Sequence, residues 1–420
     1  MRPAPRPVRS ALAVLTALSL AACSGSSAGG AGEVPVRPTA TDTGTATESP
    51  TVTATVPPLG AAPDLRVEVV ADGLEHGWDI GFLPDGAALV TERPGRVAYI
   101  PSTDPGVEAV PVEMDFGGVM AQGEGGLLGM VVHPDFASSR LFTTCLNYQE
   151  GGTPVDIRLV TWRLAEDHRS AEHVRDLLTG IPTGTGRHSG CRPTIGADGM
   201  LVVGTGDIAD GSMPQDLSRL GGKVIRFDLQ TGEPAADNPF IDAADPQQRY
   251  VLSYGHRNIQ GVAIRPGTGE IYTAEHGPSV DDEVNRIEPG GNYGWDPSRG
   301  GTVGGYDESV AMTDLERFPD AVPAVWQTGG MTEALCAAAF LEGEQWGAFD
   351  GALVVTALKG AKVVILTLDD TGAVAEVTVP AELDDEFGRL RAARLGPDGA
   401  LYITTTNGDN DMVLRVTPTD

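Results

Sequence analysis

The sequence predicts an all-β fold, a six-bladed β-propeller of four-stranded antiparallel blades. One pattern recurs along the chain, in which a turn of Gly, Asp or Pro residues stands before a short strand rich in β-forming residues. The six copies are LPDGAALVTER, HPDFASSRLFTTCLN, GADGMLVVGTGD, RPGTGEIYTAEHG, GAFDGALVVTALKG and GPDGALYITTTNGD. Five of them follow a short apolar stretch, such as LLGMVV, that is typical of the preceding strand of a hairpin. Amphipathic helical periodicity is scarce between the copies, so a propeller is the economical fold.

The ends of the predicted domain, residues 64–420, offer a way to close the ring. LRVEVVA near the start and MVLRVTP near the end are both strand-like and could pair within one blade. The spacing of the copies is irregular, however, which leaves a β-sandwich array or a parallel β-helix as alternatives.

Residues 1–22 have the plan of a bacterial lipoprotein signal peptide. Arg2, Arg6 and Arg9 precede the apolar run ALAVLTALSLAA, which is too short to span a bilayer. Small residues then precede Cys23 as in a lipobox, which predicts a lipid on Cys23; an ordinary signal peptide with a chance cysteine is the alternative. Residues 23–63 consist almost wholly of small residues, Thr, Pro and Val, and we expect a disordered tether. No later segment is typical of a transmembrane helix, so we expect an extracytoplasmic domain held at the cell membrane by lipid alone.

Acidic residues dominate the charge of the chain. There are 58 Asp and Glu residues against 29 Lys and Arg residues, for a formal net charge of −29. This charge disfavours nucleic acid and anionic lipid surfaces as partners. It also makes any cluster of basic residues more informative than usual.

The propeller hypothesis gathers scattered polar residues on one face. The first strand of a blade runs along the channel and the second returns, so residues just before the first and just after the second converge. They are Glu124, His188, Asp207, Arg257, Asn258, His276, Gly277, Pro278, Lys359, Arg389 and Arg391. Cys145 and Cys191 fall near the same face on neighbouring strands and could form a disulfide, which would leave Cys336 unpaired.

Two stretches resemble a known family. YGHRNIQGVAI, followed by EHGPSVDDEVNRIEPGGNYGW, is similar to the core of the soluble quinoprotein glucose and aldose sugar dehydrogenases, also called the glucose/sorbosone dehydrogenase family. GEGGLLGMVVHPDF, GADGMLVVGTGD, ALKG and GRLRAARLGPDG recur there in the same order, so the resemblance covers nearly everything after the tether. The lipobox together with RHSGCRPTIG further resembles surface lipoproteins of actinobacteria within that family.

The resemblance implies two cofactors, pyrroloquinoline quinone (PQQ) and Ca²⁺. The three carboxylates of the quinone require positive charge, and the residues implied for its site are Glu124, Arg257, Asn258, Lys359, Arg389 and Arg391. The backbone carbonyls of Gly277 and Pro278 match the calcium ligands of the family. Asp282 matches a position near the cofactor, whereas Asp281 and Glu283 either bind a second ion or solvate the loop, and we expect the latter.

The implied reaction is oxidation of an aldose sugar at C1 with hydride transfer to the quinone. His188 matches the family base, which takes the proton of the C1 hydroxyl, and Asp207 would orient its imidazole. A second class of function stays open, namely a cofactor-free propeller lipoprotein that binds a glycan or a protein at the cell surface. The four cationic residues and His188 favour the enzyme, whereas Glu124 favours the binding protein. The sequence names neither the sugar nor the electron acceptor.

Overall fold

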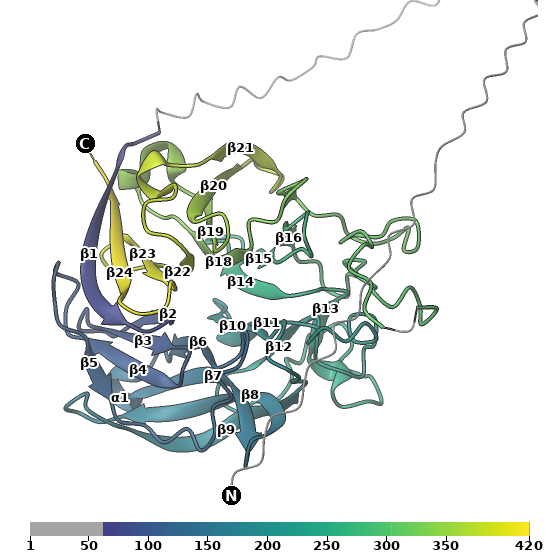
Figure 1. Ribbon diagram of the computed structural model, residues 1–420, viewed down its shortest axis with the longest axis horizontal. Coiled ribbons are helices and arrows are strands. Elements are labelled where there is room, and N and C mark those ends of the chain that lie inside the picture. The colour runs from purple at the N-terminus through teal and green to yellow at the C-terminus, as the bar shows by residue number, and fades with distance from the viewer. Residues whose placement is uncertain (1–61, 304, 420) are drawn as a thin grey trace, which may run out of the picture. The chain divides into compact units, whose positions relative to one another are not determined.

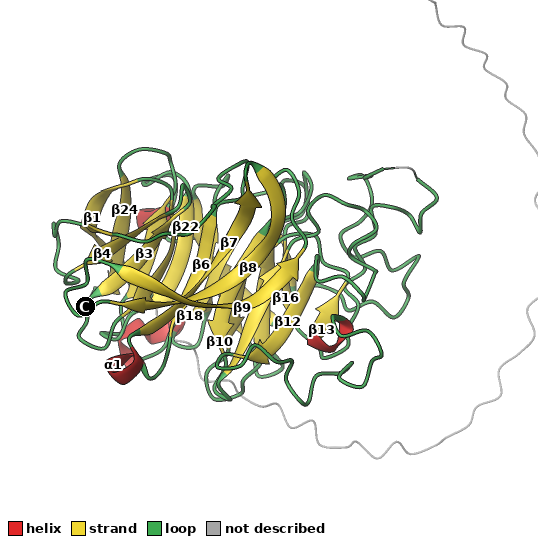
Figure 2. Ribbon diagram, turned by 90° about the horizontal axis from the view of Figure 1, so that it is seen from below, coloured by secondary structure: helices red, strands yellow, loops and turns green. Residues whose placement is uncertain are grey.

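The computed structural model describes residues 62–303 and 305–419. They form six four-stranded antiparallel sheets around one axis (Figures 1 and 2), which confirms the predicted six-bladed propeller. The predicted signal peptide, the lipid on Cys23 and the tether as far as residue 61 lie outside the described residues. Within the described ranges, the structure contains no helix with the length and apolarity that crossing a bilayer requires.

The blades follow one another along the chain. Blade 1 contains β2 (Gly77–Phe82), β3 (Ala88–Glu92), β4 (Arg96–Ile100) and β5 (Val110–Val112). Blade 2 contains β6 (Leu127–Val132), β7 (Leu141–Glu150), β8 (Thr153–Leu164) and β9 (Ala171–Ile181). Blade 3 contains β10 (Gly190–Ile195), β11 (Met200–Thr205), β12 (Lys223–Asp228) and β13 (Val251–Tyr254).

The second half of the ring has the same plan. Blade 4 contains β14 (Ile259–Ile264), β15 (Ile271–Glu275), β16 (Glu283–Arg286) and β17 (Trp326–Gln327). Blade 5 contains β18 (Leu335–Phe340), β19 (Leu353–Ala357), β20 (Lys362–Leu368) and β21 (Val374–Thr378). Blade 6 contains β22 (Leu390–Leu395), β23 (Leu401–Thr405), β24 (Asp411–Pro418) and β1 (Leu65–Leu74). Short helices lie in the loops, namely α1 (Phe136–Ser139), η1 (Gln248–Tyr250), η2 (Glu344–Phe349) and η3 (Ala381–Leu383).

Blade 6 closes the ring with both ends of the domain. Strand β1 pairs antiparallel with β24, from Leu65 opposite Pro418 to Leu74 opposite Asp411. The prediction that the first and last strands share a blade is therefore confirmed. Pairing the two ends satisfies backbone groups that would otherwise form exposed sheet edges.

The recurring turn has one chemistry in three blades. In each, a glycine with positive φ follows an aspartate whose Oδ1 accepts the N–H two residues further on, at 3.0–3.2 Å. The three pairs are Asp85 with Gly86, Asp198 with Gly199, and Asp398 with Gly399. Asp side chains stabilise such turns and glycine adopts positive φ without strain, which explains why the PDG and ADG signals marked the hairpins.

The blades pack face to face. The second strands β3, β19 and β23 are buried at every residue because a neighbouring blade covers each face of the sheet. Apolar clusters consequently run between blades; one joins Leu128 and Leu159 of blade 2 to Val203 and Ile225 of blade 3. The first strands β2, β6, β10, β14, β18 and β22 contact one another around the axis (Figure 1).

A disulfide joins blades 2 and 3. Cys145 on β7 is bonded to Cys191 on β10, with a Cα–Cα distance of 6.2 Å, and Cys336 is free and buried. The bond fastens the start of β10, directly after His188, to the neighbouring blade. It therefore steadies the backbone that carries the predicted base.

Replacing both bridged cysteines with serine is expected to lower the free energy of unfolding by about 4 kcal/mol, because the bond closes a loop of 46 residues. Urea unfolding of wild type and of the Cys145→Ser/Cys191→Ser variant measures the difference. Thiol counting in denaturant provides the control, since a chain beginning after Cys23 should show a single thiol, Cys336. Three titrating thiols without added reductant would contradict the bridge.

Candidate functional site

Backbone hydrogen bonds hold the strand ends together at one end of the propeller axis. In four blades the N–H after the second strand donates to a carbonyl before the first strand, at 2.9–3.0 Å. The pairs are Arg93 with His76, His276 with Asn258, Lys359 with Glu333, and Thr406 with Arg389. A similar bond of 2.8 Å runs between blades, from Asp207 to the carbonyl of Arg257. The polar residues that the sequence predicted to converge thus lie at this end.

His188 and Asp207 form a buried pair. The imidazole Nδ1 lies 2.7 Å from Asp207 Oδ1, and the two residues are 3% and 0% exposed. A carboxylate only accepts hydrogen bonds, so we assign the ring proton to Nδ1, which leaves Nε2 as the basic nitrogen. Gly206 makes the arrangement possible, because a β-carbon there would collide with the carbonyl of His188.

Glu124 lies beside this pair and is held by side-chain amides. Its Oε2 accepts a hydrogen bond of 3.0 Å from Asn258 Nδ2 and one of 3.5 Å from Gln260 Nε2. Burial opposes ionisation, but His276, His188 and the Asn258 hydrogen bond outweigh it and lower the pKa of Glu124. Burial lowers the pKa of His276, whose buried Nε2 has no hydrogen-bond partner in the described structure. Each of these two groups therefore favours the charged form of the other, against the cost of burial.

Several cations at this end have no acidic partner. Among the described residues, no ion pair involves Arg93, Lys359, Arg389 or Arg391, in a chain with a formal charge of −29. Partial burial is the first cause and the charge of Arg391 the second of a lowered pKa at both Arg93 and Arg389. These guanidinium groups therefore repel one another, and an anion between them would relieve the repulsion.

Residues of the first strands of two other blades hold the side chain of Arg391 in place. Its Nη1 donates to Gln260 Oε1 at 3.0 Å, and its guanidinium carbon lies 5.4 Å from the ring centre of Trp78. Arg192 covers the same ring at 4.0 Å. Arg391 is 6% exposed, and its buried Nε makes no hydrogen bond to the described residues. The side chain is thus held in place with part of its donor capacity unused.

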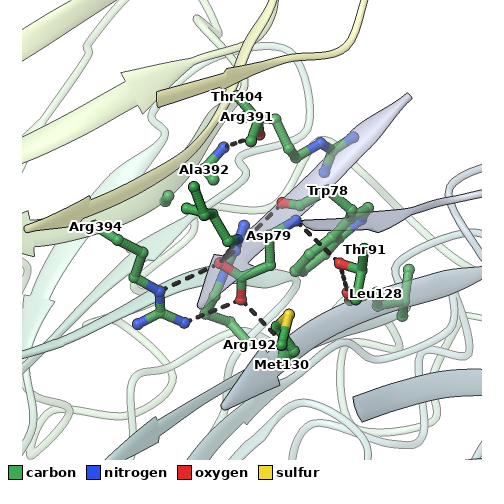
Figure 3. A network of polar contacts seen from close by, with 12 residues as sticks. Trp78, Asp79, Thr91, Leu128, Met130, Arg192, Arg391, Ala392, Arg394 and Thr404 are labelled. Atoms are coloured by element: carbon green, nitrogen blue, oxygen red, sulfur yellow. Dashed lines mark hydrogen bonds and ion pairs between the residues drawn. The ribbon is translucent and has the colours of Figure 1, made fainter. Parts of the chain in front are cut away.

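A buried ionic network lies beneath Arg391 (Figure 3). The carboxylate of Asp79 on β2 forms ion pairs with Arg192 on β10, at 2.9 Å, and with Arg394 on β22, at 3.0 Å. Burial opposes ionisation of Asp79, but the two guanidinium groups outweigh it and hold its pKa below the ordinary value. Two guanidinium groups face this one carboxylate, and Arg391 lies close by over the Trp78 ring that Arg192 also covers, so this part of the axis carries excess positive charge.

The loop after β15 is organised by Asp282. This buried carboxylate accepts hydrogen bonds from the N–H of Gly277 at 2.7 Å, from the hydroxyl of Thr332 at 2.7 Å, and from two N–H groups at residues 333 and 334. The carbonyls of Gly277 and Pro278 accept no hydrogen bond from any described residue. Two acceptors are therefore available to a cation, although the described residues contain no cluster of three His, Cys, Asp or Glu side chains suited to a metal.

Glu283 does not solvate the loop, and this expectation is wrong. The side chain is 1% exposed; Oε1 accepts from Thr313 and Gln327 at 3.0 and 3.1 Å, and Oε2 from Asn285 at 3.3 Å. It belongs to strand β16, whose fold buries it close to Glu275. The sequence suggested an exposed loop because three successive acids rarely share a buried environment. Asp281 is partly exposed and has a positive φ of 55°.

Replacing Glu283 with glutamine is expected to change how stability depends on pH. Burial, and then the charge of Glu275, raise the pKa of Glu283 to about 8 from an ordinary value of 4.5. The folded protein therefore keeps a proton that the unfolded chain releases, and the stability this contributes is complete below pH 4.5 and lost as the pH rises through 8. Relative to Glu283→Gln, wild type should lose ~2 kcal/mol or more of unfolding free energy between pH 5 and pH 9. Urea unfolding across this range measures it; parallel profiles would contradict the buried, protonated Glu283.

The sequence analysis missed several residues of the site. His76 and Arg93 occupy, in blade 1, the positions that were singled out in other blades, so the same repeat rule could have found Arg93 in LPDGAALVTER. Gln260 bridges Arg391 and Glu124 from the first strand of blade 4. Tyr306 and Trp295 both donate to Asp207 from a long loop with no strand period. Lys359 and Arg389 lie at the predicted end of the propeller axis. Their side chains are exposed, however, and no ion pair among the described residues links them to the other residues of the site.

Comparison with known proteins agrees with this fold. The glucose/sorbosone dehydrogenase family matches residues 74–415. The chain is 32% identical to the aldose sugar dehydrogenase YliI of Escherichia coli over 370 residues, covering 86% of this chain and 95% of the relative. A glucose dehydrogenase structure from Thermus thermophilus, named a putative oxidoreductase, is 35% identical, with a TM-score of 0.70 over 84% of this chain and 99% of the other.

A further solved structure contains a cofactor. The PQQ-bound form of an aldose sugar dehydrogenase from Streptomyces coelicolor is 29% identical to this chain, with a TM-score of 0.66 over 84% of this chain and all of the other. The family match spans the whole propeller apart from its outermost residues, and the resemblance inferred from the motifs is confirmed. On these grounds the chain belongs to the glucose/sorbosone dehydrogenase family of oxidoreductases.

Proposed function

We propose that this protein is a quinoprotein aldose dehydrogenase that oxidises a sugar at C1 and uses PQQ and Ca²⁺. The observation that carries the proposal is the buried His188–Asp207 pair beside a group of cations without acidic partners. A propeller that only binds a glycan or a protein has no need of a buried base next to unpaired guanidinium groups. The carboxylate of Glu124, which favoured that alternative, is accommodated by the amides of Asn258 and Gln260.

The residues of this chain fit a ligand with several carboxylates. Arg257 Nε, His276 Nε2 and Arg391 Nε are buried without hydrogen-bond partners among the described residues, so a polar ligand would satisfy them. Arg93, Arg389 and Lys359 add positive charge at the same end. The carbonyls of Gly277 and Pro278 are hard oxygen ligands of the kind that Ca²⁺ prefers. When bound, the quinone supplies the hydride acceptor and the calcium ion acts as a Lewis acid.

His188 would remove the proton of the C1 hydroxyl as hydride leaves the same carbon. Its Nε2 is the nitrogen available for this step, because Nδ1 donates to Asp207. Asp207 fixes the orientation of the ring and stabilises the imidazolium once the proton has arrived. Burial of both groups strengthens this interaction, because water screens it poorly.

Reconstitution tests the proposal. Purified protein is mixed with PQQ and Ca²⁺, binding is followed by quinone absorbance, and dye reduction is measured with a panel of aldoses. Uptake of the quinone and dye reduction with at least one aldose are expected, and removal of calcium with a chelator should abolish reduction. Quinone binding without turnover of any aldose would refute the dehydrogenase, and the absence of binding would favour the binding protein, to be pursued with glycan arrays.

The proposal places the enzyme outside the cytoplasm, anchored through a lipid on Cys23. The motive is the lipobox and the small-residue tether that follows it. Membrane fractionation should recover wild type with the membrane and a Cys23→Ala variant in the soluble or precursor fraction. Equal membrane recovery of the two would contradict the lipid anchor.

A further inference from the structure

A long segment of blade 4, residues 287–325, joins β16 to β17 and reaches the predicted base. Its first part is pinned to blade 3: Asn292 and Gln215 exchange two side-chain hydrogen bonds of 3.0 Å, and the N–H of Trp295 donates to the carbonyl of Gly255 at 2.9 Å. The buried indole of Trp295 then donates from Nε1 to Asp207 Oδ2 at 2.9 Å. The last residue of the GGNYGW motif, Trp295, therefore binds the carboxylate that orients His188.

The same segment brings a tyrosine hydroxyl between the two members of the pair. The Tyr306 hydroxyl donates to Asp207 Oδ2 at 2.6 Å and lies 3.3 Å from His188 Nδ1. Because its proton is directed to Asp207, its lone pairs face the Nδ1 proton of His188. We propose that Tyr306 is a positioning residue for the His188–Asp207 pair, an inference that rests on the proposed function.

The hydrogen-bond inventory explains what the hydroxyl adds. Asp207 Oδ1 accepts from His188 Nδ1 at 2.7 Å and from the N–H of Ala209 at 2.8 Å, whereas Oδ2 accepts from Trp295 and Tyr306. Four donors leave the carboxylate plane little freedom to rotate. They also share its negative charge, so Tyr306 limits how strongly Asp207 favours the protonated imidazole. The hydroxyl thus helps to fix the carboxylate that sets the direction of Nε2.

An ion-pair anchor holds the Tyr306 part of the segment over the site. One oxygen of Glu308 lies 3.0 Å from Arg187 Nη2 and 2.9 Å from Arg257 Nη2. The charged and titratable groups around His188 come from several elements; they are Glu124 before β6, Arg187 beside the histidine, Asp207 after β11, Arg257 before β14, and Tyr306 and Glu308 on residues 287–325. Among the described side chains, only Tyr306 contacts both members of the pair through one atom, which makes its hydroxyl a clean target.

The test compares Tyr306→Phe with Tyr293→Phe in the full chain. Each change removes one hydroxyl from the same segment, but the Tyr293 hydroxyl donates to the carbonyl of Arg286 and does not contact the pair. The ring nitrogens of His188 are followed by NMR over pH in protein without cofactor, with the signal assigned from a His188→Gln variant. We expect the pH midpoint of the His188 titration to rise by ~0.5–1 pH unit in Tyr306→Phe, and to stay at the wild-type value in Tyr293→Phe.

The reconstituted enzyme supplies the second measurement. Tyr306→Phe should lower kcat by ~3- to 30-fold with KM for the aldose nearly unchanged, and the acidic limb of its pH profile should move upward with the NMR midpoint. An unchanged midpoint, or an equal shift in Tyr293→Phe, would overturn the positioning role. The two proposals fail separately, since the NMR measurement needs no cofactor. If the His188 midpoint shifts in Tyr306→Phe but the wild-type protein oxidises no aldose, the dehydrogenase is rejected and the positioning role of Tyr306 is kept.

Should Tyr306→Phe fold poorly, Glu308→Asp offers a second route. It keeps the negative charge that acts on His188 but shortens the side chain that reaches Arg187 and Arg257, so the His188 titration midpoint should move in the same direction by a smaller amount. Because the Glu308 side chain is 42% exposed, high salt should weaken the anchor in wild type as well. A His188 midpoint insensitive to both Glu308→Asp and salt would show that the segment does not position the pair.

Discussion

Replacing His188 with alanine is expected to lower kcat for aldose oxidation by ~10²- to 10⁴-fold, the usual contribution of a positioned general base. Binding of PQQ should remain nearly intact, because the cations and not the imidazole provide the charge for the quinone. Asp207→Asn should show an intermediate loss, since an amide both accepts and donates and so no longer specifies the Nδ1 proton. Steady-state dye reduction and quinone titration separate the two effects.

His173→Ala is the matched control for this experiment. His173 lies on β9, and its side chain is 50% exposed and pairs with Asp176. Activity in this variant should equal that of wild type. If His188→Ala retains wild-type turnover while it binds the quinone, His188 is not the base. If it loses quinone binding in parallel with turnover, its role is in binding rather than in proton transfer.

Replacing Arg391 with alanine is expected to raise the Kd for PQQ by ~30-fold or more, because removing one partner of a buried charge pair costs ~2–5 kcal/mol. The free protein should not be destabilised in proportion. Arg391 has no acidic partner among the described residues and lies near Arg93, Arg192 and Arg389, so its loss relieves repulsion when no anion is bound. Quinone titration by absorbance and urea unfolding of the free protein measure the two quantities.

Arg163→Ala provides the control for Arg391. Arg163 is 51% exposed on the outer strand β8 and pairs with Glu172 at 3.0 Å, so its loss should change neither quantity. Arg391→Lys should recover part of the quinone affinity, since it restores the charge without the planar guanidinium that lies over Trp78. A Kd unchanged in Arg391→Ala would remove Arg391 from the cofactor site.

The repeat could be predicted because its signal is local. Asp85–Gly86, Asp198–Gly199 and Asp398–Gly399 each specify a tight turn through their own backbone angles and side-chain oxygen. Short strands with buried faces then specify sheets, and a ring of six such sheets brings equivalent strand ends to one face. The positions of His188, Asp207 and Arg257 follow from this repeat without any knowledge of the loops.

The buried state of Glu283 could not be predicted from the same rules. Its neighbours in the sequence are acidic and polar, which is the pattern of a solvated loop. Thr313 and Gln327, which donate hydrogen bonds to the buried side chain, come from a distant part of blade 4. An ionisable side chain can be buried only where such hydrogen-bond partners are present, and no local sequence pattern indicates them.

The sequence by itself determined the propeller, the closing pair of strands and the face on which the polar residues gather, because turn chemistry and strand period act over a few residues. Only the tertiary structure decided which of those residues touch. Tyr306 contacts His188 across 118 residues and Gln260 contacts Arg391 across 131, each through an irregular loop or a neighbouring blade. Hydrogen bonds of this kind depend on distances and directions between separate elements, which are set when the blades pack and leave no periodic trace in the chain.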